Sequence, residues 1–419
     1  MLKKFKISDL KWPDLFAIIL AFLMPLFPKL IPVLLVFLFL SLLTDFKKIK
    51  LHKEFKLMAW LYSLTYLFYV FGMLNSSHIQ DGLFTLEVKL SFLVIPLFFL
   101  FHGPFHVNVL RKILFSFVIG CFINSLLCLY KGYTCYLETG WWECFFTSFL
   151  SFGFHTTYLS VYYCLSILFI IYFLINYYSR LKIVMVIILL FLIVYFSGFV
   201  LLLSSKGGLV ALLTVLAVAF FYFIYKRGSV RIAIFTFCGI LVLGFVFYFT
   251  TDMVQTRVSL AFKAFQLTKN ELFEKHRHST ESTEVRLMIW HVAGREIQKH
   301  PLGVGTGDAK YVLLEKYKEL GMTGAYKAKL NCHNQFYETA LAIGIHGLLV
   351  LVIFLVYLLG SAIKKRNFIL LWIVVIVMLN LFFESMFETQ AGVVFFVFFT
   401  GLLLTSVPDV IPLQQDEKD

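Results

Sequence analysis

Long apolar runs, separated by short polar segments, are the feature that most constrains how this chain folds. A helix needs roughly 20 apolar residues to cross the hydrocarbon core of a bilayer, and lipid cannot satisfy an unpaired backbone polar group. The chain is therefore predicted to be an all-α polytopic membrane protein with about 12 transmembrane helices. The first two runs are short and flank Pro28 and Pro32, so we expect a tight or tilted hairpin there. The expected spans are 14–28, 30–45, 57–74, 86–102, 108–130, 154–177, 183–203, 207–225, 232–251, 337–360, 367–384 and 391–407.

The composition indicates that lipid is the main solvent of this chain. Of its residues, 60% are hydrophobic and 15% are charged, and 50 are phenylalanine. An average soluble domain is about half apolar and about a quarter charged. A formal net charge of +13 would suggest nucleic acid as the partner of a soluble protein, but here the basic residues lie mostly in the short loops between apolar runs. We therefore expect membrane lipids, and no nucleic acid, among the partners.

The distribution of Lys and Arg over the loops predicts the orientation of the chain. Alternate loops are rich in these residues, and cytoplasmic loops carry such an excess, so both termini are expected in the cytoplasm. The N-terminus has no small-residue cleavage site after its apolar run, which predicts a retained first helix. The opposite short loops hold only Lys29, Lys89, Lys131 and Lys206. The expected organisation is helices over 1–251, a long helical periplasmic loop over 252–335 that carries part of the active site, helices over 336–407, and a cytoplasmic tail over 408–419.

The cysteines do not form a metal-binding pattern. Seven are present, without a CxxC pair or a Cys/His spacing typical of zinc sites, so no metal is expected. Cys135 and Cys144 lie in a segment expected on the outer side, where they form either a disulfide or two free thiols. Trp141 and Trp142, between them, are typical of an interfacial aromatic belt.

Lys206 is the first of the polar residues that stand out at the ends of apolar runs. It lies between two predicted helices in the stretch LLLSSKGGLVALL. It can hold an anionic head group, with the Ser205 hydroxyl and the amides around Gly207 as further donors. The alternative interpretation is an interfacial lysine whose ammonium reaches to the membrane surface beside a turn.

Arg286 lies on a predicted helix that begins near Thr283 and ends before Pro301. With Trp290 it shares one face of this helix, and arginine binds phosphate through a planar fork of donors. The alternative is a solvated arginine on an amphipathic helix. The glycine pattern at 303–307 lacks the lysine of a phosphate-binding loop, which predicts only a turn.

His333 and Asn334 lie where the long polar segment leads into the next apolar run. A histidine can act as a base near neutral pH, because its unperturbed pKa is about 6.5. The start of a helix also favours a nearby anion. The alternative is that the pair only caps this helix.

Two acidic residues and two further histidines complete the polar groups near apolar runs. Glu384 and Glu388 precede the last run, where they can orient cations or accept a proton, or can simply be solvated. His155 and His346 lie within apolar runs, and we interpret both as packing residues.

Together, these stretches resemble the O-antigen ligase/polymerase superfamily of bacterial envelope glycosyltransferases. The resemblance covers roughly residues 190–405, and the closing stretch FETQAGVVFF is also similar to the end of the family. The matching elements, in their order, are Ser205-Lys206-Gly207, then Arg286 and Trp290 followed by His300-Pro301-Leu302-Gly303, then His333-Asn334.

The resemblance implies a membrane-embedded fold of the GT-C type and a polyprenyl-diphosphate-linked glycan as donor, without a metal or nucleotide cofactor. Ligases pass the glycan to the lipid A core, polymerases pass it to another lipid-linked repeat, and a third branch passes it to protein hydroxyls. The ligases depend on two arginines that hold the diphosphate and on a histidine. These correspond to Lys206, Arg286 and His333, and lysine at the first position keeps the charge but loses the bidentate fork.

The expected function is therefore that of an O-antigen ligase at the periplasmic face of the bacterial inner membrane. It would transfer a preassembled glycan from undecaprenyl diphosphate to a lipid A core sugar hydroxyl, with His333 as the base and the cations of Lys206 and Arg286 stabilising the leaving group. O-antigen or capsule polymerisation and transfer to protein are alternatives within the class. A polysaccharide or lipid transporter, the alternative from another class, predicts buried charges and broken helices. The expected substrate-binding residues are Ser205, Gly207, Trp290, Asn334 and Glu388.

Overall fold

A computed structural model describes residues 10–48, 50–177, 179, 181–227, 269–280 and 283–404 of the chain. Every regular element in these ranges is a helix. The predicted span 232–251 and the predicted tail 408–419 lie outside the described residues.

The predicted membrane spans appear as helices wherever the structure describes them. Six stretches among the described residues are long and apolar enough to cross a membrane, and shorter apolar helices accompany them, so the chain is a polytopic membrane protein. The first two helices have only 12 and 10 residues, and they pack against each other. The helices are α1 (Trp12–Leu23), α2 (Ile31–Leu40), α3 (Lys53–Gly72), α4 (Ile79–Lys89), α5 (Ser91–His102), α6 (Val107–Thr139), α7 (Thr147–Leu150), α8 (Thr156–Tyr177), α9 (Ile183–Leu203), α10 (Lys206–Arg227), α17 (Gln335–Lys364), α18 (Phe368–Leu381) and α19 (Gln390–Leu404).

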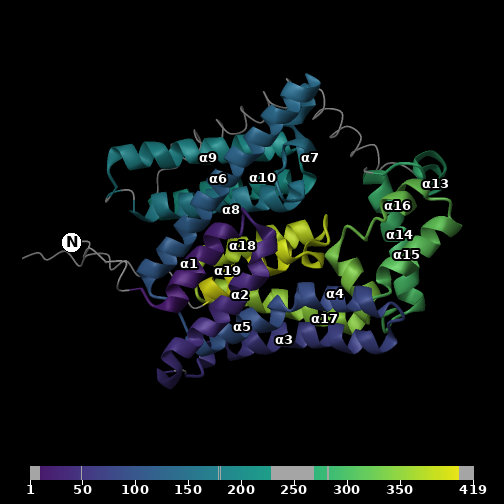
Figure 1. The fold of residues 1–419 in the computed structure, drawn as a ribbon, viewed down its shortest axis with the longest axis horizontal. Coiled ribbons are helices and arrows are strands. Elements are labelled where there is room, and N and C mark those ends of the chain that lie inside the picture. The colour runs from purple at the N-terminus through teal and green to yellow at the C-terminus, as the bar shows by residue number, and fades with distance from the viewer. Residues whose placement is uncertain are drawn as a thin grey trace, which may run out of the picture.

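Helices from opposite ends of the chain pack side by side in the bundle. Helix α19 is buried from Gly392 to Leu404 and packs on α5 and α18, while α17 packs on α3 and α18 (Figure 1). Helix α8 is buried over most of its length and contacts α9 and α10. The apolar side chains of these helices form one continuous core.

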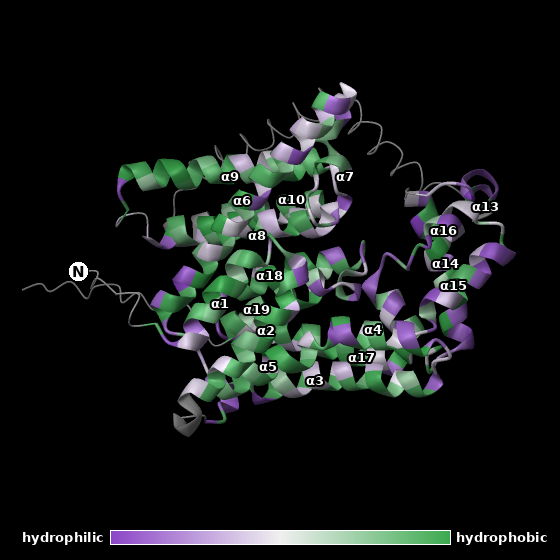
Figure 2. Ribbon diagram, viewed as in Figure 1, coloured by the Kyte–Doolittle hydropathy of each residue, from purple (hydrophilic) through white to green (hydrophobic). Residues whose placement is uncertain are grey.

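The polar segment, residues 269–280 and 283–334, gathers at one end of the bundle (Figure 2). It contains α13 (Lys269–His276), α14 (Thr283–Lys299), α15 (Ala309–Glu319) and α16 (Thr323–Ala328). Helix α14 ends just before Pro301, as predicted. One apolar stripe of α14 is buried in a second core with α15 and α16. The stripe consists of Val285, Met288, Ile289 and Val292.

Three lysines that the sequence placed in short loops, Lys89, Lys131 and Lys206, lie in helices instead. Helix α6 runs past Lys131 to Thr139 and ends where Gly140 adopts a left-handed conformation, φ +73°. A fall in hydropathy marks the end of an apolar run, but a helix ends only where its backbone is capped. Lys89 is the last residue of α4 and is fully buried. Cys135, in the last turns of α6, forms a disulfide with Cys144 beyond the helix, with a Cα–Cα distance of 5.7 Å.

Helix α17 is broken close to its start. The backbone of Ile343 and Gly344 is not helical, with φ angles of −124° and +79°. A break of this kind deprives carbonyl and amide groups of their helical partners, which is costly in lipid. The break separates a first half-helix, residues 335–342, from the rest of α17.

A loop of the polar segment, residues 301–305, fills this break. Its backbone supplies two donors to the carbonyl groups of the first half-helix and one acceptor to an amide of the second. The glycine pattern at 303–307 was predicted to be only a turn. It belongs instead to a loop that satisfies the backbone groups left unpaired by the break in α17. The bonds run from Val304 N to Leu341 O (2.9 Å), from Gly305 N to Ala342 O (3.0 Å) and from Ile345 N to Pro301 O (2.9 Å).

Candidate functional site

A polar cavity lies between the helix bundle and the polar segment. Its volume is about 210 Å³. Lys206, Arg286 and His333, which are far apart in the sequence, all line it. The full lining consists of His155, Thr156, Thr157, Ser204, Ser205, Lys206, Gly207, Thr280, Thr283, Glu284, Val285, Arg286, Leu330, His333 and Phe383.

Lys206 enters this cavity from the tight turn between α9 and α10. Helix α9 ends at Leu203, the next residue Ser204 has a left-handed φ of +47°, and α10 begins at Lys206 itself. The Lys206 ammonium donates a hydrogen bond to the Thr283 hydroxyl at 2.5 Å. This bond joins the bundle to the first residue of α14, so the lysine contacts the polar segment rather than extending freely to a membrane surface.

Arg286 lies in the first turns of α14 and reaches the segment between α18 and α19. Its Nη1 donates to the Phe383 carbonyl at 2.8 Å, and its Nη2 lies 3.6 Å from Glu384 Oε2. A guanidinium has five N–H donors in one plane. These two contacts fix that plane and still allow other donors to bind an anion in the cavity.

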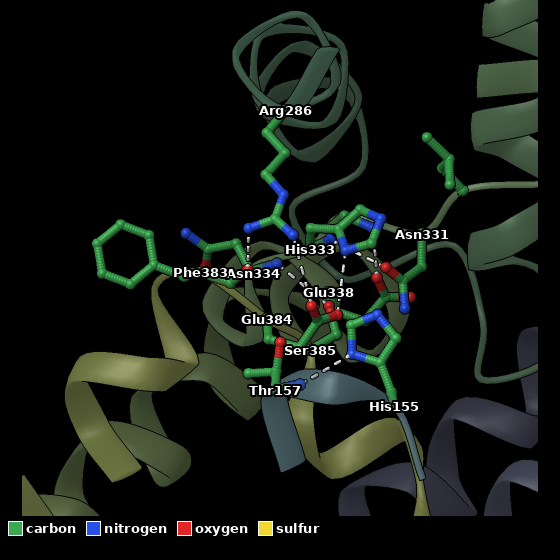
Figure 3. Close-up of polar contacts among 12 residues, drawn as sticks. His155, Thr157, Arg286, Asn331, His333, Asn334, Glu338, Phe383, Glu384 and Ser385 are labelled. Atoms are coloured by element: carbon green, nitrogen blue, oxygen red, sulfur yellow. Dashed lines mark hydrogen bonds and ion pairs between the residues drawn. The ribbon is translucent and has the colours of Figure 1, made fainter. Parts of the chain in front are cut away.

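His333 and Glu384 form a hydrogen-bonded pair at the cavity (Figure 3). His333 Nδ1 lies 3.0 Å from Glu384 Oε1. Burial would raise the pKa of Glu384, but the hydrogen bond from His333 and the charges of His333 and Arg286 lower it below its ordinary value. Because an ionised carboxylate can only accept, Nδ1 carries the proton and Nε2 is the basic nitrogen of the neutral ring.

The backbone of His333 is also constrained. Its φ of +45° lies in the left-handed region, which costs a residue other than glycine about 1–3 kcal/mol unless its surroundings enforce it. Here the Asn331 side chain accepts a hydrogen bond from the His333 amide at 3.0 Å. Strained backbone of this kind is concentrated at functional sites.

Asn334 and Trp290, expected to bind substrate, do not line the cavity but hold the segment that carries His333. The Asn334 side chain accepts hydrogen bonds from two amides of the first turn of α17 and so caps this helix. It also donates to the Phe382 carbonyl at 3.2 Å. The Trp290 indole donates to the Cys332 carbonyl at 2.9 Å. Of the expected substrate contacts, Ser205 and Gly207 do line the cavity.

Glu388 lies away from the cavity lining and pairs with a buried lysine. Its carboxylate is 2.8 Å from Lys89 Nζ and accepts a hydrogen bond from Gln335 at 3.0 Å. A buried ammonium is costly without a paired carboxylate and further hydrogen bonds. The Glu388 carboxylate therefore neutralises the charge of Lys89. These two residues are far apart in the sequence.

The sequence alone assigned no functional role to His155 and no specific partner to Glu384. His155, interpreted as a packing residue, lines the cavity at the start of α8. Glu384 was predicted only as an acidic group near the last run, and it binds both His333 and Arg286. The role of a lone histidine or glutamate beside an apolar run depends on the residue that it contacts. The local sequence therefore could not predict the roles of His155 and Glu384.

This arrangement can bind an anion and accept a proton at neighbouring points. Lys206 and Arg286 supply fixed positive charge, and the Ser205 hydroxyl adds a donor. The His333–Glu384 pair supplies a base whose protonated form is stabilised by the carboxylate. Among the described residues, no group of three or more His, Cys, Asp and Glu could hold a metal ion.

The comparison with protein families covers most of the residues that line this cavity. Residues 191–352 match the family model described as O-antigen ligase. The match includes Lys206, Arg286 and His333 and the loop that fills the break in α17. No curated protein matches the chain. Members of this ligase/polymerase family are glycan-transferring enzymes of the bacterial inner membrane that use lipid-linked glycans. Residues 191–352 of this polytopic membrane protein thus match the O-antigen ligase domain.

Proposed function

We propose that this protein is an O-antigen ligase that transfers a preassembled glycan from undecaprenyl diphosphate to a hydroxyl of a lipid A core sugar. The reaction would occur at the periplasmic face of the inner membrane. One observation carries the proposal: two cations and a histidine–carboxylate pair converge on one cavity next to the membrane helices. A donor with a prenyl tail and a hydrophilic glycan needs a site at such a boundary.

The chemistry is a displacement at the anomeric carbon of the donor. The acceptor hydroxyl oxygen forms a bond to this carbon while the bond to the diphosphate oxygen breaks, which inverts the configuration. The electron pair of the broken bond stays on the diphosphate, where Lys206 and Arg286 stabilise the added charge. The hydroxyl proton passes to His333 Nε2, and Glu384 stabilises the resulting imidazolium.

The structure contains two features that a transporter would have, but both are stabilised by contacts within the protein. The chain does contain a broken helix and a buried charge, as a transporter would. The break in α17 is filled by backbone hydrogen bonds from residues 301–305. Lys89 is bound by Glu388 and the Phe387 carbonyl. Each is satisfied within the protein and lies away from the cavity that Lys206 and Arg286 line.

Gene deletion and complementation in the native host test this proposal. Loss of the gene should abolish the lipopolysaccharide ladder on a gel and cause lipid-linked polymer to accumulate, and wild type should restore the ladder. Arg286→Ala and His333→Ala should reduce ladder formation by at least about 100-fold, because each removes a group that acts on the transition state. Arg295→Ala is the matched control, since Arg295 lies on the same helix outside the cavity lining.

Other outcomes would replace the proposal. A single repeat attached to the core, with long chains missing, would identify a polymerase. A normal ladder with a missing capsule or glycoprotein would identify another acceptor. Full rescue by both Arg286→Ala and His333→Ala would show that the reaction does not take place in this cavity.

A further inference from the structure

A second imidazole, that of His155, lines the cavity and has no part in the reaction described so far. It immediately precedes α8 and therefore belongs to a different wall of the cavity than His333, which precedes α17. Figure 3 shows both rings beside the Glu384 carboxylate, each from its own element. Glu384 experiences the charge of His155 as well as those of His333 and Arg286.

The hydrogen bond of His155 determines which ring nitrogen carries its proton. His155 Nδ1 accepts the amide hydrogen of Thr157 at 3.4 Å. An amide can only donate, so Nδ1 of the neutral ring is unprotonated and Nε2 carries the hydrogen. His333 has the opposite tautomer, because its Nδ1 donates to Glu384. The cavity thus contains one imidazole with a basic Nε2 and one with a donor at Nε2.

The wall that carries His155 is joined to the turn that carries Lys206. The Thr157 hydroxyl lies within hydrogen-bond distance of the Ser205 hydroxyl, 2.9 Å away. Ser205 and Thr157 are both buried, so this bond fixes the start of α8 against the start of α10. Ser205 is the neighbour of Lys206 in the chain, so His155 and Lys206 line the same cavity from two joined walls.

We infer that His155 is a further catalytic residue, whose Nε2–H binds the phosphate oxygen that leaves the anomeric carbon. This inference rests on the proposed function. In that step the bond between carbon and phosphate oxygen breaks and its electron pair stays on this oxygen. The proton of the acceptor goes to His333, and His155 keeps its own proton and supplies a hydrogen bond. Such a bond strengthens as charge develops, so it lowers the barrier more than it improves donor binding.

The competing role of His155 is to cap α8. The acceptor Nδ1 and the donor Nε2 can be mimicked separately, by the side-chain amides of asparagine and glutamine. His155→Asn places an acceptor near the position of Nδ1, which retains the bond to the Thr157 amide but removes the donor at Nε2. His155→Gln places an NH₂ donor near the position of Nε2 but loses the acceptor for the Thr157 amide. The two variants therefore test capping and catalysis in opposite directions.

His106 offers a matched control in the same chain. It precedes α6, and its Nδ1 accepts the Asn108 amide at 3.3 Å in the same pattern. It is not part of the cavity lining. His106→Asn and His106→Ala thus report the effect of a histidine cap alone on stability and activity.

The experiment uses the full-length purified protein, an undecaprenyl-diphosphate-linked O-glycan donor and rough lipopolysaccharide as acceptor. We expect kcat to fall about 10- to 100-fold in His155→Asn and His155→Ala, with little change in KM for the donor. His155→Gln should recover part of kcat although its melting temperature is lower than that of His155→Asn. The His106 variants should keep the wild-type kcat.

The inference is overturned if His155→Asn retains the wild-type kcat, or if His155→Gln is the less active of the two variants. Failure of this inference is distinguishable from failure of the proposed function. If only the inference about His155 fails, Arg286→Ala and His333→Ala are still inactive in the same assay. If the proposed function fails, these two variants are as active as the wild type.

Discussion

At the scale of single residues, the polar groups of the cavity hold one another in position before any substrate is bound. Lys206 contacts Thr283, and Arg286 contacts both the Phe383 carbonyl and Glu384. Preorganised charges of this kind need no reorganisation as a leaving group develops its charge. Lysine and arginine differ here, because Lys206 presents one compact charge whereas Arg286 presents a planar set of donors.

Glu384 provides a prediction about both activity and pH. Glu384→Gln keeps the shape of the side chain but removes the charge that stabilises a protonated His333, so activity should fall by about tenfold or more. The pKa of Glu384 is lowered in the folded state. The carboxylate therefore stabilises the fold above its unfolded pKa, about 4.3, and this contribution is lost as the pH falls through the lower folded pKa.

Melting temperatures in detergent check the sign of this dependence. At pH 7 the wild type should be more stable than Glu384→Gln, and the difference should shrink as the pH is lowered below about 4. A difference that grows on acidification would mean that Glu384 is protonated in the native state. Activity at pH 7, measured on the same samples, separates the catalytic effect from the stability effect.

At the scale of elements, the break in α17 and the loop 301–305 form one unit. Gly303 and Gly344 face each other there, with φ angles of +90° and +79°. A Cβ atom at Gly303 would lie 2.5 Å from the Gly344 amide nitrogen, and one at Gly344 would lie 2.5 Å from the Leu302 carbonyl carbon. The first half-helix follows directly from His333, so the fit of this junction determines how the histidine is presented.

Alanine substitution at either glycine should therefore reduce both stability and activity. We expect Gly303→Ala and Gly344→Ala each to destabilise the protein by about 1–3 kcal/mol, because the left-handed backbone and the close backbone contact both oppose a methyl group. The melting temperature and the transferase activity of purified protein measure this. Gly360→Ala is the control within α17, since no atom lies within 4 Å of its Cβ position. Equal behaviour of Gly344→Ala and Gly360→Ala would contradict the role of the break.

At the scale of the whole molecule, the polar segment is attached to the bundle at several points, some of them away from the cavity. One lies at the start of α15, where Asp308 accepts hydrogen bonds from the amides of Ser77 and His78 at 2.8 and 2.9 Å. The His78 ring also binds Asp308 at 2.7 Å and stacks on Tyr311. Burial would raise the pKa of Asp308, but these hydrogen bonds lower it below its ordinary value.

Asp308→Ala should loosen the polar segment from the connection between α3 and α4. The loss of an acceptor for partly buried amides costs about 1–3 kcal/mol, so trypsin should cleave the polar segment faster in the variant. Because the pKa of Asp308 is lowered on folding, the wild-type advantage should be present at neutral pH and decline below about pH 4. Glu319→Ala is the control, since Glu319 pairs with Lys316 of the same helix, α15. An unchanged cleavage rate in Asp308→Ala would show that this attachment is dispensable.

The sequence by itself determined that the chain is a polytopic membrane protein and indicated Lys206, Arg286 and His333, which line one cavity in the structure. Apolar runs and the stripe on α14 depend on local composition and periodicity, because lipid and the core select for them residue by residue. The order of Lys206, Arg286 and His333 carried the family resemblance that residues 191–352 bear out. None of these features requires knowing which distant residues touch.

Only the tertiary structure decided which polar side chains are partners. Lys89 and Glu388 are 299 positions apart, and His333 and Glu384 are 51 apart. Glu388, predicted at a substrate site, is used to compensate a buried lysine, whereas His155 reaches the cavity from the start of α8. The physical reason is that an ionic or hydrogen-bonded group takes its role from the partner within a few ångströms, and that partner is set by how the helices pack.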